Sequence, residues 1–152
     1  MIPNLLFKDT TMNTLTDNHT ANLTPTHNGS AILAVAGRFM LATLFVLSGV
    51  SKITGPAATL GYIESAGLPL PHLALAGAIA VEILGGLALI AGYRTRLVAL
   101  ALAAFSLVTA LAFHSALADQ NQFIHFFKNI AIAGGLFQVA AFGAGRIAFD
   151  AK

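Results

Sequence analysis

Four long apolar segments dominate this chain and restrict what it can fold into. They run over residues 31–51, 73–93, 97–118 and 123–145, and each contains at most one formally charged side chain. A helix of about 20 apolar residues is long enough to cross the hydrocarbon layer of a bilayer. The sequence therefore predicts an all-α integral membrane protein built as a four-helix transmembrane bundle.

A soluble four-helix bundle is the competing fold, and it would need a polar stripe along each helix. The third segment, LVALALAAFSLVTALAFHSALA, has only three hydroxyl groups and one histidine among its apolar residues. Charged residues make up 9% of the whole chain, whereas a soluble domain has about 25%. This composition favours the membrane fold. The net charge of +2, without a basic run, also gives no reason to expect a nucleic-acid partner.

The segments outside the spans define the domain organisation. Residues 1–30 are rich in Thr and Asn, and we expect a disordered polar tail ahead of a membrane domain at 31–150. The first residues, MIPNLLF, lack the basic start and the length of a signal peptide. Between the first two spans, Pro56 and Gly67 bracket a short helix, which we expect either at the membrane interface or packed over the bundle.

Basic residues near the span ends predict the orientation in the membrane. An even number of spans places both termini on one side, together with the turn that carries Arg94 and Arg96. Further basic residues lie at the C-terminus, whereas the opposite side holds only Lys52 and Lys128. We therefore expect both termini in the cytoplasm.

One carboxylate lies near the middle of a span, in the stretch VEILGGLALIAG. This residue, Glu82, must face protein or water because ionisable groups are costly in lipid. At about 1.5 Å rise per residue, the span boundaries put Arg38 within a few ångströms of the same depth. We therefore predict a buried structural ion pair between Arg38 and Glu82. Gly85 and Gly86 share the helix face of Glu82, which predicts the close approach of another helix there.

A second group of polar residues lies towards the span ends that are remote from the termini. Its members are Lys52, His72, His114, His125, Lys128 and Asn129. If the bundle is compact, these residues could ring one cavity. Three interpretations stay open: a purely structural role, a site for a small molecule such as a quinone head group, and a surface that docks a partner.

Intrinsic cofactors and metals are not expected. The histidines lie near the interface, without a carboxylate or a spaced ligand pair beside them, so neither a haem nor a metal site is favoured. The chain contains no cysteine, so it supplies no thiol nucleophile and no iron–sulfur ligand.

Short motifs follow one another in a fixed order from Gly37 to Asp150. They are GRFMLATLFVLSGVSK, YIESAGLP, EILGGLALIAGYRTR, a histidine at 114, KNIAIAGGL and GAGRIAFD. In order and spacing they resemble the DoxX family of small membrane proteins. The polar positions that match the family pattern are Arg38, Lys52, Glu82, His114, Lys128 and Asn129.

The resemblance implies a four-helix protein of the bacterial cytoplasmic membrane. It also implies a link to quinone chemistry, since the family takes its name from a small subunit of an archaeal quinone-linked oxidase system. We therefore expect an accessory subunit of a quinone-linked redox complex and not a stand-alone enzyme. Two rivals stay open: a non-enzymatic scaffold for a partner protein, and a small-molecule transporter that works as a homo-oligomer. The candidate contacts for a quinone or an anion are Lys52, His114, Lys128 and Asn129.

Overall fold

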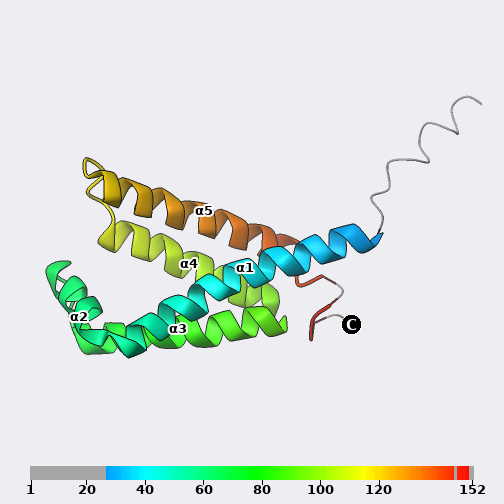
Figure 1. Ribbon diagram of the computed structural model, residues 1–152, viewed down its shortest axis with the longest axis horizontal. Helices are drawn as coiled ribbons and strands as arrows, with labels where there is room; N and C mark the ends of the chain where they lie inside the picture. The colour runs from blue at the N-terminus through cyan, green and yellow to red at the C-terminus, as the bar shows by residue number, and fades with distance from the viewer. Residues whose placement is uncertain (1–26, 146, 151–152) are drawn as a thin grey trace, which may run out of the picture. The chain divides into compact units, whose positions relative to one another are not determined.

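The computed structural model of the chain describes residues 27–145 and 147–150. Within these residues all regular structure is helical (Figure 1). The helices are α1 (His27–Thr54), α2 (Pro56–Ser65), α3 (Pro71–Ala91), α4 (Thr95–Phe113) and α5 (Gln120–Phe142). All except α2 are long and apolar enough to cross a membrane. The predicted all-α fold, with four spans and a short helix between the first two, is confirmed.

Local chemistry explains where several of the helices begin and end. Pro71 stands at the first position of α3, where the missing N–H breaks no helical hydrogen bond. Asp119 caps α5, because its side chain accepts a hydrogen bond of 2.9 Å from the N–H three residues further on. The helix α4 ends at Phe113, ahead of the predicted end at residue 118. Hydropathy does not reveal this turn, because residues 116–118 are apolar.

Most of the predicted polar tail (residues 1–30) lies outside the described part of the chain, because the description begins at residue 27. Its last residues belong to α1, which begins at His27. The contacts described below concern the compact unit that starts at Ala31. The C-terminal basic residues that entered the prediction of orientation, Arg146 and Lys152, also lie outside the described residues.

Two glycines let α1 and α3 approach each other closely. A Cβ atom at Gly86 of α3 would lie 2.7 Å from Cγ2 of Val46 and 3.2 Å from the carbonyl oxygen of Ala42. A Cβ atom at Gly49 of α1 would lie 2.7 Å from the side chain of Ile83. A larger residue at Gly86 would press against the backbone of α1, whereas at Gly49 it would require the Ile83 side chain to move. Small residues commonly allow such contacts between membrane helices.

The neighbouring glycine of α3 faces a different helix. A Cβ atom at Gly85 would lie 2.8 Å from the side chain of Leu102 in α4. Leu102 is itself fully buried, as are Leu89 of α3 and Leu136 of α5. The predicted close approach at Gly85 and Gly86 is confirmed: Gly85 contacts α4, and Gly86 contacts α1. One apolar core thus holds α3, α4 and α5 together.

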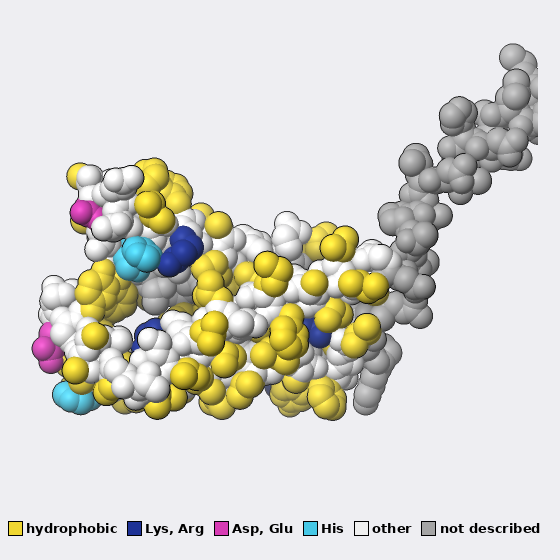
Figure 2. Space-filling model, viewed as in Figure 1, with side chains coloured by type: hydrophobic (Ala, Val, Ile, Leu, Met, Phe, Trp, Pro, Cys, Tyr) yellow, Lys and Arg dark blue, Asp and Glu magenta, His cyan; other side chains and the backbone are white. Residues whose placement is uncertain are grey.

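The outer surface of the long helices is strongly apolar. Hydrophobic side chains spread along the face seen in Figure 2. Large exposed residues from four helices include Met40, Leu47, Leu84, Leu111 and Phe137. Such a surface is too large for a soluble monomer, whereas in a bilayer it contacts acyl chains. The exposed residues therefore agree with four spans in contact with lipid.

The segment after α5 folds back onto the α3–α4 turn. The N–H of Asp150 donates to the carbonyl oxygen of Gly92 at 3.0 Å. The Asp150 carboxylate accepts hydrogen bonds from the N–H groups of Thr95, at 2.6 Å, and Arg94, at 2.9 Å. No side chain at the N-cap position of α4 caps this helix, so Asp150 satisfies donors at its start. The hydrogen bond from Thr95, more than any other contact, lowers the pKa of Asp150 below its ordinary value.

Candidate functional site

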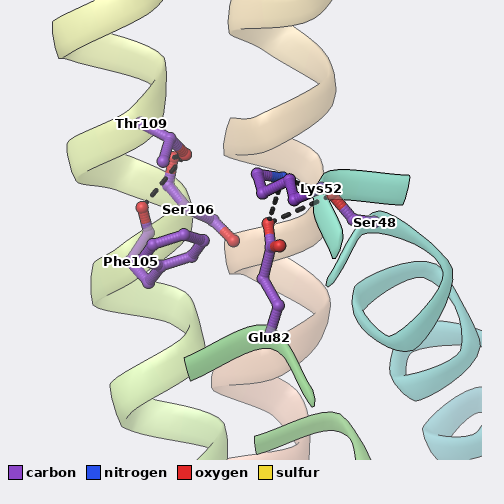
Figure 3. Close-up of polar contacts among 6 residues, drawn as sticks. All are labelled: Ser48, Lys52, Glu82, Phe105, Ser106 and Thr109. Carbon is purple, nitrogen blue, oxygen red and sulfur yellow. Dashed lines mark hydrogen bonds and ion pairs between the residues drawn. The ribbon is translucent and has the colours of Figure 1, made fainter. Parts of the chain in front are cut away.

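A buried ion pair joins α1 and α3. Nζ of Lys52 lies 2.8 Å from Oε1 of Glu82, and Ser48 donates to the same oxygen at 3.1 Å. Lys52 also donates to Oγ of Ser48 at 2.9 Å, so the three side chains close a ring (Figure 3). The side chain of Glu82 is 5% exposed and that of Lys52 is 20% exposed. Since a buried charge needs a hydrogen-bonded partner, this ring is what holds a carboxylate inside the bundle.

The predicted ion pair between Arg38 and Glu82 is wrong, because the cation beside Glu82 is Lys52. The prediction assumed that neighbouring spans begin and end at equal depths. The helices are instead shifted, so that a Cβ atom at Gly49 would lie 3.3 Å from Cβ of Glu82. Arg38 lies beside Gly92, and a helical rise of about 15 Å separates Gly92 from Glu82. Close packing of α1 against α3 therefore selects the partner.

Arg38 binds the C-terminal segment. Its Nη2 donates to the carbonyl oxygen of Ile147 at 2.8 Å, and its Nη1 donates to the carbonyl oxygen of Ala144. The residue is buried, with 3% of its surface exposed. Arg38 thus ties α1 to the same segment that caps α4. It stabilises the end of the bundle that is remote from Glu82.

The ion pair forms part of the wall of a cavity of about 650 Å³. Figure 2 shows a hollow between α2 and the α4–α5 turn, with histidine and basic side chains at its edge. All four candidate contacts line the cavity, and they are Lys52, His114, Lys128 and Asn129. The structure therefore brings these positions together, while their contact with a ligand stays a prediction. His72 and His125, which were expected in the same group, lie outside the lining.

A chain of hydrogen bonds connects side chains at the edge of the cavity. Nδ1 of His114 lies 2.9 Å from Oε1 of Gln122, and Nε2 of Gln122 donates to the Tyr62 hydroxyl at 3.0 Å. The Tyr62 hydroxyl donates in turn to the carbonyl oxygen of Phe113 at 3.1 Å. An amide oxygen only accepts, so the hydrogen between His114 and Gln122 belongs to His114. The Tyr62 ring also stacks on Phe113, with 5.5 Å between centroids. These contacts fasten α2 to the ends of α4 and α5.

Lys128 approaches the cavity from α5. Its Nζ lies 2.8 Å from Nδ1 of His125. A lysine ammonium group can only donate, so the histidine nitrogen accepts. The His125 ring stacks in turn on His114, with 5.0 Å between centroids. His125 thus positions two residues of the wall without lining the cavity itself.

Two hydroxyl groups of α4 complete the inner wall. Ser106 lies on the side of α4 that faces Glu82 (Figure 3), and Thr109 follows it in the lining. The Ser106 hydroxyl donates to the carbonyl oxygen of Leu102 at 2.9 Å, and the Thr109 hydroxyl donates to that of Phe105 at 3.0 Å. Each hydroxyl has one hydrogen, which the backbone already accepts, so lone pairs remain for a ligand.

Sequence reasoning did not select Ser48, Tyr62, Ser106 or Thr109 as site residues. The available signal was their spacing. Ser48 precedes Lys52 by one helical turn, and Ser106 and Thr109 lie three residues apart in an apolar helix. Each pair therefore shares one helix face. For Tyr62, the sequence allowed a short helix that packs over the bundle but gave no signal that this side chain would line a cavity.

Apart from Thr59, the rest of the wall is apolar, and it reaches the lipid-facing surface. Phe45, Ile63 and Phe105 are among the lining residues. Leu44 of α1 and Val108 of α4 also line the cavity, although 41% and 62% of their surfaces are exposed. The cavity thus adjoins the surface that lipid covers. A ligand could keep its polar end at the ion pair while an apolar chain extends towards the bilayer.

Four spans around a core of leucine and alanine, with a buried ion pair beside a cavity, define a small multi-pass membrane protein. The chain belongs to the DoxX family, whose profile matches residues 33–115. The membership predicted from the order of the motifs is confirmed.

Two relatives from Escherichia coli (strain K12) support this placement. The chain is 40% identical to the inner membrane protein YqjF over 116 residues, which cover 76% of this chain and 88% of the relative. It is 29% identical to the inner membrane protein YphA over 126 residues, which cover 80% and 90%. No solved structure matches the chain.

Proposed function

We propose that this protein binds an isoprenoid quinone in the cavity and serves as a membrane subunit of a quinone-linked redox system. The observation that carries the proposal is Oε2 of Glu82. This oxygen is buried, belongs to a residue of the cavity wall and has no hydrogen-bond partner among the residues that the structure describes. A buried polar atom without a partner is costly. An amphiphilic ligand whose polar head carries a hydrogen-bond donor, as the hydroxyl group of a reduced quinone does, would satisfy it.

The cavity suits both parts of a quinone. Lys52, Lys128 and Asn129 offer donors to the oxygen atoms of the head group. Leu44 and Val108 offer an apolar path for the isoprenoid chain. The volume, about 650 Å³, lies within the usual range of ligand pockets. A bound quinone would supply the redox chemistry, and the residues named here would hold and orient it.

The protein is best understood as an accessory subunit. With no cysteine in the chain, it has no thiol and no iron–sulfur ligand of its own. Electrons would then pass between the quinone and a partner protein. We therefore propose that the protein presents quinone to a partner and does not act as an enzyme alone.

We also infer that both termini face the cytoplasm. Arg94 lies in the α3–α4 turn and Arg96 in the first turn of α4, and such basic residues favour the cytoplasmic side. This orientation puts the cavity in the half of the bilayer remote from the cytoplasm. The two relatives named above are inner membrane proteins, which supports the same membrane for this chain.

Mass spectrometry of quinones extracted from protein purified in mild detergent tests the proposal. The double variant His114→Phe/Lys128→Met removes polar contacts of the cavity and keeps the pair between Lys52 and Glu82. The control is His72→Phe, which changes a histidine outside the lining. We expect near-stoichiometric quinone in the natural protein and in the control, and about a tenfold loss in the double variant, as two lost hydrogen bonds would give.

A natural protein that carries no quinone would contradict the proposal. A protein partner recovered in its place would favour the scaffold alternative. In that case a substitution at Glu64, which is exposed on α2, should weaken binding of the partner protein more than any substitution in the cavity.

A further inference from the structure

We infer that the cavity selects a ligand with a hydroxyl group at its inner end, so that it binds a quinol in preference to the corresponding quinone. The identity of this ligand rests on the proposed function. The selectivity rests on the hydrogen-bonding groups of the inner wall, which can be tested separately.

Glu82 sets the requirement for a donor. Its Oε1 accepts hydrogen bonds from Ser48 and Lys52, whereas its buried Oε2 has no partner within residues 27–145 and 147–150. As the anion of an ion pair, the carboxylate has lone pairs and no hydrogen to donate. A quinone carbonyl beside Oε2 would set lone pairs against lone pairs. A quinol hydroxyl would instead donate a hydrogen bond to a charged acceptor, which is among the stronger kinds.

Lys52 strengthens the same choice. Its ammonium group has three hydrogens, and Ser48 and Glu82 accept two of them. A carbonyl oxygen could accept the third but would leave Oε2 of Glu82 unsatisfied. A hydroxyl group both donates and accepts, so it can satisfy Glu82 and Lys52 together. The quinol therefore meets the needs of both members of the ion pair, and the quinone meets only one.

The wall formed by α4 adds acceptors on the inner side. The hydroxyl groups of Ser106 and Thr109 donate to backbone carbonyls, which leaves their lone pairs for a ligand. The other ionisable residues of the lining, His114, Lys128 and Tyr62, join the hydrogen bonds at the edge of the cavity. Acceptors thus gather at the inner end, where a ligand hydroxyl is needed.

Binding measurements with four probes test the inference. Purified protein freed of quinone is titrated, without oxygen, with decylubiquinol and with decylubiquinone. The non-redox probes are 4-dodecylphenol and its methyl ether, which differ by one donor. We expect the quinol to bind at least about tenfold more tightly than the quinone, as one hydrogen bond to a charged group would give. The phenol should bind more tightly than its methyl ether by a similar factor.

Variants locate the effect in the wall. Thr109→Val removes an acceptor for the second hydroxyl of the quinol, because the inner hydroxyl donates its one hydrogen to Glu82. This change should reduce the preference for quinol about threefold, the effect of one neutral hydrogen bond. Thr43→Val is the matched control, because Thr43 also donates to the carbonyl four residues earlier but is exposed on α1. Glu82→Gln should abolish the preference, since an amide can donate to a carbonyl. If Glu82→Gln does not fold, two comparisons still test the inference: Thr109→Val against Thr43→Val, and the phenol against its methyl ether.

The outcomes separate this inference from the proposed function. A quinone that binds as tightly as the quinol, or an ether that binds as tightly as the phenol, overturns the inference and leaves the proposed function standing. A phenol that binds while both quinone forms fail supports the hydroxyl requirement and removes the proposed function. Failure of all four probes to bind overturns both.

Discussion

A carboxylate in the middle of a membrane span is stable here because Lys52 and Ser48 donate to one of its oxygens. A buried ion pair adds little stability compared with an apolar pair, but removal of one partner leaves the other charge uncompensated. The ring around Glu82 should therefore respond very differently to single and double substitutions.

Lys52→Met should lower the free energy of unfolding by about 3 kcal/mol, because Glu82 is left buried without a cation. The double variant Lys52→Met/Glu82→Leu should recover most of the loss. Unfolding in mixed detergent micelles measures both. Lys128→Met serves as the control, since Lys128 donates to a histidine at the edge of the cavity and forms no ion pair with another described residue. A double variant no more stable than Lys52→Met would show that the two residues do not act as a pair.

Among the helices, the packing of α1 against α3 decides which residues meet. The sequence predicted close approach at Gly85 and Gly86, because glycines in an apolar helix are a local signal. It could not predict the register, since span boundaries leave a helix free to slide by several residues. Contacts at Gly49 and Gly86 fix that register. For this reason the position of Glu82 was predictable and its partner was not.

Gly86→Ala should destabilise the protein by about 1–3 kcal/mol, the usual cost of overpacking. The added Cβ would lie 2.7 Å from Val46 and 3.2 Å from a backbone oxygen of α1. Gly77→Ala is the control on the same helix, because none of the described neighbours would come within 4 Å of its Cβ atom. That change should be neutral or slightly stabilising, since alanine is the better helix former. Equal losses in the two variants would mean that α1 does not pack at Gly86.

The hydrogen bonds to Asp150 make the C-terminal contact dependent on pH. They lower its pKa in the folded protein below the ordinary value of 3.8. A carboxyl group with a lowered pKa stabilises the fold above its unfolded pKa, and the contribution is lost as pH falls through the folded value. The cap on α4 should therefore persist at neutral pH and be lost only below about pH 4.

An NMR titration of the Thr95 amide in detergent checks this expectation. Its resonance should shift with a midpoint below 3.8, the ordinary value of the Asp150 carboxyl. Asp150→Asn should remove the transition, because the amide side chain does not titrate. A midpoint above 3.8 would contradict the assigned hydrogen bonds.

At the scale of the molecule, orientation decides which side of the membrane the cavity serves. The chain has no cysteine, so in a variant with one introduced cysteine any maleimide labelling of the protein's thiols comes from that position. Ala66→Cys, in the turn after α2, should react in intact cells with a maleimide that does not cross membranes. Tyr93→Cys, in the α3–α4 turn, should react only after permeabilisation. The opposite pattern would place the cavity in the cytoplasmic half of the bilayer.

The four spans, the short helix and the family were predictable because hydropathy and motif order are properties of local sequence. The grouping of Lys52, His114 and Lys128 followed from their similar depth, and the cavity brings them together. Its inner wall was not predictable. A single hydroxyl such as that of Ser106 looks the same in a lipid-facing helix and in a cavity, and only tertiary packing tells the two apart.

Photoaffinity labelling with an azido-quinone, followed by peptide mapping, tests most directly whether the cavity holds a quinone. We predict labelled peptides from α1 and α4 around Phe45 and Phe105, which both line the cavity. An excess of decylubiquinol should suppress the label. Labelling spread over lipid-facing residues such as Met40 and Leu111, and unaffected by the competitor, would contradict a quinone site in this cavity.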